Sequence, residues 1–312
     1  MKTKIYSRRK IVGGVIGLAA AGIAGGGLMK TLNSSLGDFS AFPDTERMPA
    51  VFVGHGTPMS AIRPNEWTER WIELGKRLPE PAAILSISAH WITERGALVT
   101  ASEKPPMNYD MYGFPPEMYQ ITYPAPGHFG LASEVANKLE GQLPVNLDTQ
   151  WGFDHATWVV LKYMFPEADI PVIQLSIDYS KPPSFHYELG KHLQFLRTKG
   201  VLIFGSGNMV HNLSMRPGTN NDQPLDWARE FDTTMWTRIQ EGNYQAVADF
   251  QKLGSAASLS HPTYDHFLPV LYCLGVTMDK DEITTFNDNF QWPAVSMRSF
   301  IIANTNLPTA SL

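Results

Sequence analysis

The stretch "AAILSISAHW", residues 82–91, joins a β-branched apolar run to a histidine and a tryptophan at its end. Its composition predicts a strand that is buried on both faces, because strands of covered parallel sheets read as nearly continuous apolar runs. Ile84, Leu85 and Ile87 supply the buried surface, and that packing gives no reason for an imidazole at the strand's tip. His90 is therefore the first candidate functional residue.

Similar apolar runs alternate with helical patterns along the chain. "MPAVFVGH" (48–55), "IPVIQLSID" (170–178) and "VLIFGSG" (201–207) predict further buried strands, and "SMRSFIIAN" (296–304) predicts a closing strand. "NEWTERWIELGKRL" (65–78) places its apolar residues on one helical face. This alternation favours an α/β fold with a mainly parallel central sheet and helices on both faces.

Length and composition limit the organisation and the partners of the protein. The chain has 312 residues, 43% of them hydrophobic, and shows no repeat or composition break after residue 46, so we expect one domain over residues 46–312. The net charge of −5, without a basic patch, argues against nucleic acid as a partner. The single cysteine, Cys273, lies in an apolar stretch and is expected in the core.

The first 45 residues have the pattern of an export signal and a linker. Five basic residues and no acid occur in "MKTKIYSRRK", and the next 19 residues are uncharged. The paired arginines resemble a bacterial twin-arginine signal, so we expect the twin-arginine export machinery as a partner. The protein is then expected in the periplasm, or anchored to the outer face of the inner membrane through this segment alone. Cleavage and retention stay open, because 19 apolar residues just suffice to span a bilayer.

Several of the nine histidines follow predicted strands or begin predicted helices. Ligands of open α/β sheets bind beyond the carboxyl ends of the strands, so these side chains are expected to meet at one edge. Neutral imidazole is a good ligand for Fe(II), Zn(II) and Cu(II), which makes a transition-metal site the leading interpretation. The candidates are His55, His90, His155, His211, His261 and His266.

Other local signatures are absent or weak. The chain contains no "HExxH", "CxxC" or "GxSxG", and "GSGNMVHN" lacks the lysine of a phosphate-binding loop. His186 and His192 fall on polar positions of a predicted surface helix, where we expect them to be solvated. Tyr123 is the first residue of "YPAPG", and His128 follows this stretch at the start of a predicted helix. Both are candidate substrate contacts.

Seven segments in the order of the chain carry a resemblance to a known family. They are "FVGHGTPM", "SAHW", "YPAPG", "WGFDHATW", "QLSID", "GSGNMVHNL" and "HPTYDHFLPVLYCLG", spread over residues 48–304. Together they resemble the class III extradiol ring-cleavage dioxygenases, and within them the 4,5-DOPA dioxygenase extradiol-like branch. The resemblance implies that residues 46–312 form a dioxygenase-like catalytic domain.

The resemblance also implies roles for the histidines. It implies one Fe(II) or Zn(II) per chain, held by His55, His90 and His266. His211 corresponds to the family's acid/base histidine, and His155 to a histidine close to the substrate.

Three residues are expected to act behind these histidines. Asp154 or Asp178 is expected to orient a histidine through its second nitrogen. His261 is expected to contact the ligand residues without binding the metal itself.

The third metal position departs from much of the wider class. Many members use two histidines and a glutamate, whereas here the position is His266, with Asp265 beside it. A neutral three-histidine set is also a common way to hold catalytic zinc, so the choice between iron and zinc stays open.

The function implied is a metal-dependent, extradiol opening of a catechol (DOPA-like) ring with O2. The alternatives are a zinc-dependent hydrolase on the same scaffold and an exported, non-catalytic binding protein. The aromatic segment at 107–127 fits a wall over a flat ring equally well as an ordinary Pro-rich loop with its aromatics packed inward. The particular catechol, the bond cleaved and the oligomeric state are not predicted.

Overall fold

The computed structural model describes residues 38–215 and 223–304. The predicted export signal lies almost entirely in residues 1–37, outside the described residues. Within the described ranges, no helix combines the length and the apolar character needed to cross a membrane. Phe42, ahead of the expected domain start at 46, already packs into the core.

A mixed eight-stranded sheet, in the order β4-β3-β5-β2-β6-β1-β10-β7, forms the centre of the molecule. The four central strands β5, β2, β6 and β1 are mutually parallel. On one side β10 pairs antiparallel with β1 and β7 pairs antiparallel with β10, and on the other side β3 pairs antiparallel with β5. The expected α/β fold with a mainly parallel sheet is confirmed. The strands are β1 (Ala50–Gly54), β2 (Ala83–Thr93), β3 (Ala97–Thr100), β4 (Val145–Asp148), β5 (Val172–Asp178), β6 (Val201–Gly207), β7 (Asp281–Asn287) and β10 (Ser299–Asn304), with a separate hairpin of β8 (Phe290–Trp292) and β9 (Val295–Ser296).

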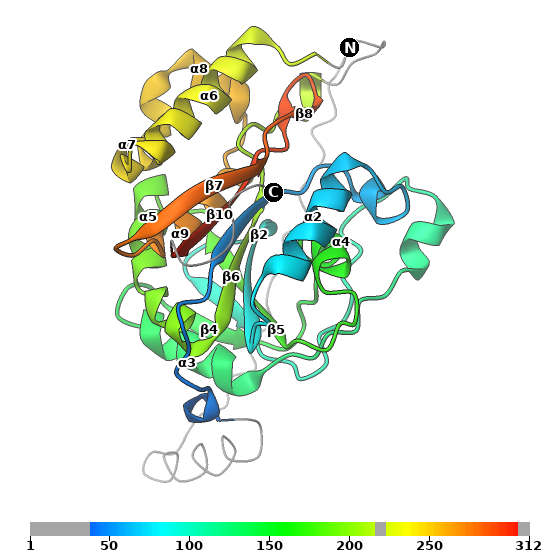
Figure 1. Cartoon of the computed structure of the whole chain (residues 1–312), viewed down its shortest axis with the longest axis vertical. Coiled ribbons are helices and arrows are strands. Elements are labelled where there is room, and N and C mark those ends of the chain that lie inside the picture. The colour runs from blue at the N-terminus through cyan, green and yellow to red at the C-terminus, as the bar shows by residue number, and fades with distance from the viewer. Residues whose placement is uncertain (1–37, 216–222, 305–312) are drawn as a thin grey trace.

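Helices cover both faces of the sheet (Figure 1). α2 and α4 pack on one face, and α3, α5 and α9 pack on the other, with α6, α7 and α8 beyond them. The helices are α2 (Glu66–Arg77), α3 (Phe129–Leu139), α4 (His155–Met164), α5 (Pro183–Lys191), α6 (Asp226–Gln240), α7 (Tyr244–Ala248), α8 (Ser255–Ser260) and α9 (Leu268–Gly275).

Alternating side chains of each central strand enter two different hydrophobic clusters. In β1, Ala50 and Phe52 join the cluster under α5 and α9, while Val51 and Val53 join the cluster under α2 and α4. Burial on both faces is the physical reason that these strands read as continuous apolar runs. The edge strand β7 is only partly buried and reads as polar, so the sequence did not predict it.

The expectation that His186 is solvated was wrong. α5 packs tightly against α9, and a Cβ atom at Gly190 would lie 2.7 Å from the Tyr272 carbonyl oxygen. His186 is therefore fully buried, with Nδ1 3.0 Å from the Tyr272 hydroxyl. The sequence pattern marked His186 as polar, although its position is in the core. His192, one residue past the helix, is half-buried.

Candidate active site

The carboxyl ends of the parallel strands open into a cavity of about 600 Å³. Five histidines line it, together with residues from the 111–114 segment, the turn after β1 and the β8–β9 hairpin. The histidines are His55, His90, His155, His211 and His266. These side chains thus meet at the carboxyl ends of the parallel strands, where the sequence pattern predicted them to lie.

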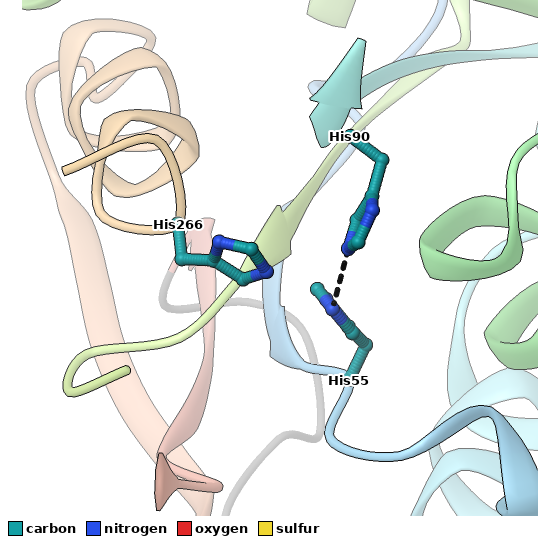
Figure 2. Close-up of side chains that lie close together, drawn as sticks. All are labelled: His55, His90 and His266. Carbon is teal, nitrogen blue, oxygen red and sulfur yellow. Dashed lines mark hydrogen bonds between the residues drawn. The ribbon is translucent and has the colours of Figure 1, made fainter. Parts of the chain in front are cut away.

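Three of these histidines point toward one another (Figure 2). His55 follows β1, His90 belongs to β2, and His266 comes just before α9. One ring nitrogen of each lies within 4.8 Å of those of the other two, and the two Nε2 atoms of His55 and His90 are 3.3 Å apart. The geometry matches a set of ligands around a single centre.

A bulge in β2 directs His90 to this centre. β2 was expected to end at His90, but it continues to Thr93. Ile87 pairs with Leu175 and Ile92 with Ile177, so residues 88–91 of β2 face only Ser176 of β5. Bulges of this kind re-aim a side chain, and here the extra residues carry His90 out of the regular ladder.

The second ring nitrogen of His55 is held by a serine. The Ser206 hydroxyl donates to the Ala156 carbonyl at 2.7 Å, so its oxygen is left to accept from Nδ1–H of His55 at 3.2 Å. Nε2 of His55 then carries a lone pair and faces the centre. Such hydrogen bonds behind a ligand fix the tautomer that binds a metal.

Asp110 holds two histidines at once, and the sequence analysis missed it. Its carboxylate lies 2.9 Å from Nδ1 of His90 and 3.0 Å from Nδ1 of His155, and it accepts the backbone N–H of His155 at 2.9 Å. Burial alone would raise the Asp110 pKa, but the hydrogen bonds from the two histidines outweigh it and lower that pKa far below its usual range. An isolated acid in an aromatic stretch was the only available signal.

His211 and His266 lie face to face beside this centre. Their rings stack with centroids 3.5 Å apart and an angle of 4° between the planes. Nδ1 of His266 is buried without a hydrogen-bond partner among the described residues, and it lies 3.7 Å from the Asp265 carboxylate. His211 makes no side-chain hydrogen bond within the described ranges, so its ring is free to contact a molecule in the cavity.

Burial sets the charge of the histidines. It lowers the pKa of His55, His155, His211 and His266, and neighbouring histidines lower each pKa further. These rings are therefore neutral at pH 7, the form that binds metals and accepts protons.

His90 differs from the other four. Burial lowers its pKa, but the hydrogen bond and charge of Asp110, with the charges of Asp154 and Asp265, outweigh burial and raise it. A proton on His90, or a metal ion, satisfies the two facing Nε2 atoms of His55 and His90.

The donor set fits a transition metal. Three imidazole nitrogens in a buried pocket, two of them with their second nitrogen hydrogen-bonded, are the ligand type that Fe(II) and Zn(II) accept. The cavity leaves room beside them for a small molecule.

The two carboxylates that were expected to orient a histidine have other partners. Asp154 caps α4 through the Thr157 N–H and accepts from Ser88 and Gln174. Asp178 accepts the backbone N–H groups of Arg95 and Gly96. Neither bonds a histidine, so Asp110 has the position predicted for them.

Three further candidates lie apart from the cavity lining. The Tyr123 hydroxyl donates to the Phe165 carbonyl, and Nδ1 of His128 accepts the Leu131 N–H at the start of α3. His261 is buried, and its Nε2 donates to the Met209 carbonyl at 2.9 Å. Each of the three side chains thus has a hydrogen-bond partner outside the cavity, and for Tyr123 and His261 that partner is distant in the sequence.

The aromatic segment at 107–127 combines both of its predicted interpretations. Residues 111–114, including Tyr112 and Phe114, line the cavity. Met118 and Tyr123 pack inward, and the Tyr109 hydroxyl donates to the Ile121 carbonyl. Part of the segment is therefore a cavity wall and the rest is its support.

The chain is similar to known proteins over most of its length. The family described as "Catalytic LigB subunit of aromatic ring-opening dioxygenase" matches residues 52–297. A "4,5-DOPA dioxygenase extradiol" from Escherichia coli (strain K12) is 42% identical over 259 residues, covering 81% of this chain and 94% of that protein. A protein of the same description from Beta vulgaris is 34% identical over 259 residues, covering 81% and 96%. A crystal structure of an uncharacterized Escherichia coli K12 protein matches with a TM-score of 0.70 and 39% identity, over 82% of this chain and 100% of that one.

Proposed function

The chain belongs to the LigB family of class III extradiol ring-cleavage dioxygenases, and from that premise we propose that it opens a catechol ring with O2 at the histidine site. The single observation that carries the proposal is the convergence of His55, His90 and His266 at the edge of the sheet. In this reaction the carbon–carbon bond beside the two hydroxyls breaks. Both atoms of O2 enter the product, a semialdehyde acid, and no external reductant is consumed.

His55, His90 and His266 would hold the metal, and we propose Fe(II) for this position. Bound Fe(II) supplies a site for the catechol oxygens and for O2 and allows electrons to pass from the ring to oxygen. The neutral ligand set leaves the charge of the metal uncompensated, which favours an anionic catecholate as substrate.

His211 is proposed as the acid/base group. Its pKa is lowered by burial first and by His266 and His261 next, so its ring is neutral and can accept a proton from the catechol hydroxyl. Its stacking on His266 keeps it within the cavity beside the proposed metal ligands. The same ring can return the proton later in the cycle.

His155 is proposed to orient the substrate. Its Nδ1–H donates to Asp110, so its Nε2 is an acceptor for a substrate hydroxyl. Tyr112, Phe114 and Trp292 provide aromatic surfaces on the cavity wall against which a flat ring can pack.

The DOPA-like substrate is supported by the descriptions of the relatives from Escherichia coli and Beta vulgaris. A zinc-dependent hydrolase is the second candidate, and the set of three histidines without a carboxylate is the observation that favours it. In that case the site would activate water in place of O2.

Reconstitution with defined metals tests these two functions. Metal-free protein is loaded anaerobically with Fe(II) or with Zn(II), and oxygen uptake is measured with DOPA and with simple substituted catechols. We expect one O2 per catechol and a coloured semialdehyde with Fe(II) only. Absence of uptake with every catechol, combined with ester hydrolysis by the zinc form, would replace the dioxygenase by the hydrolase.

A further inference from the structure

Backbone pairing between two segments brings Asp110 next to α4. The Asn108 N–H donates to the Phe153 carbonyl at 2.8 Å, and the Phe153 N–H donates to the Pro106 carbonyl at 2.9 Å. A Cβ atom at Gly152 would lie only 1.8 Å from the Pro106 carbonyl oxygen, so the two segments are in direct contact. This pairing brings the Asp110 carboxylate to the first turn of α4, where its charge is stabilised.

The same carboxylate decides the tautomer of two rings. An ionised carboxylate only accepts hydrogen bonds, so Nδ1 of His90 and Nδ1 of His155 must both carry hydrogen. In the neutral form of each ring, which is the form that binds a metal, Nε2 is then unprotonated. For His90 this is the nitrogen that faces Nε2 of His55.

The residues after Asp110 form the cavity wall. Met111, Tyr112 and Phe114 line the cavity directly, so the carboxylate joins this wall to His90 and to His155. The side chain of Asp110 itself is only 14% exposed.

From this geometry we infer that Asp110 is a positioning residue that presets His90 for metal binding and His155 for substrate binding, and thereby couples the cavity wall to the metal centre. The inference rests on the proposed function for its substrate half, while its metal half concerns the three-histidine site alone. Asp110 acts through the two rings and needs no contact with the metal or the substrate.

Asp110→Asn is the decisive variant. The amide keeps the shape, but its NH2 group would face one Nδ1 as a donor and drive that ring to the tautomer with hydrogen on Nε2. Loss of such an outer partner typically weakens metal affinity by about 10–100-fold. Glu117→Gln is the matched control, because Glu117 is an exposed carboxylate in the same segment.

Affinity for Zn²⁺ is measured by competition with a chromogenic chelator on folded, metal-free protein. We expect about 10–100-fold weaker binding in Asp110→Asn, partial recovery in Asp110→Glu and no change in Glu117→Gln. At saturating Fe(II), Asp110→Asn should also raise KM for the catechol, because His155 is no longer oriented. Asp110→Ala removes the same acceptor and repeats the test if the Asn variant does not fold.

Unchanged Zn²⁺ affinity in both folded Asp110 variants would overturn the inference. The inference would also be overturned if the wild type bound two Zn²⁺ per chain and the Asp110 variants bound only one. His90, Asp110 and His155 would then be ligands of a second ion. The affinity comparison requires no turnover. Failure of the wild-type protein to cleave any catechol therefore removes the proposed function and leaves the metal half of the inference to be decided by affinity.

Discussion

Two cavities of nearly equal volume, about 610 and about 600 Å³, lie at opposite ends of the parallel strands. The first is lined by residues where the parallel strands begin, such as Met48, Ala82 and Gly200. The second lies where the same strands end and contains the five histidines. Size therefore does not distinguish the candidate site, whereas the chemistry of the lining does.

Strand direction explains this difference. Loops that follow parallel strands all leave the sheet at one edge, so side chains from distant parts of the chain meet there. His55 and His211 come together in this way, whereas His266 lies between α8 and α9 and its carbonyl accepts the Asn208 N–H just after β6. The described residues that line the other cavity include no histidine and no cluster of metal ligands.

The buried histidines outside the site make the same point. Burial lowers the pKa of both His186 and His261 to about 4. Each has a protein hydrogen-bond partner, and neither belongs to a group of converging nitrogen atoms. A lowered pKa alone therefore does not distinguish the candidate metal site, whereas the convergence of ring nitrogens does.

Replacing a proposed ligand should have the largest effect. Separate His55→Ala, His90→Ala and His266→Ala variants are expected to lose Zn²⁺ affinity by more than about 100-fold, beyond the typical loss of an outer partner. Oxygen uptake with Fe(II) should disappear as well. Metal analysis and thermal denaturation check this, and a variant that retains one metal per chain would remove that residue from the ligand set.

Replacing His211 should separate metal binding from chemistry. His211→Gln removes the proposed proton acceptor, and we expect kcat to fall by about 10²-fold or more, as is typical for a lost acid/base group. Its metal content should equal that of the wild type. Steady-state kinetics with a catechol and metal analysis of the same sample decide the matter, and an unchanged kcat would contradict the assignment.

His186 should affect stability and leave the site alone. Its folded-state pKa lies below that of the unfolded chain, so its contribution is full above pH 6.5 and decreases as pH falls toward about 4. In His186→Gln this pH-dependent loss, up to about 3 kcal/mol, should be absent. Urea unfolding at several pH values measures the difference. His192→Gln, at a half-buried histidine beside the same helix, should behave like the wild type.

Obstruction of each cavity should give the smallest effects and the sharpest contrast. Leu213 is 42% exposed and lines the histidine cavity, so Leu213→Trp is expected to raise KM for a catechol by about 10-fold. Glu80→Trp adds the same bulk at the opposite cavity and should leave KM and kcat unchanged. Equal effects of the two variants would mean that the opposite cavity also takes part in turnover.

Much of the fold was accessible from the sequence. The apolar run ending in "SAHW" predicted a buried strand, and the spacing of similar runs predicted the mainly parallel sheet, because burial on both faces leaves a continuous apolar pattern. The position of His55 and His90 at strand ends, and of His211 and His266 in loops, was enough to predict the edge where they meet.

The tertiary structure alone decided how these side chains are held. The bulge at residues 88–91 depends on pairing with β5, and the partners of Asp110 lie 20 and 45 residues away along the chain. The burial of His186 depends on the packing of α5 against α9. Periodicity reports which face of an element is buried, whereas hydrogen bonds between distant segments depend on the folded positions of both partners.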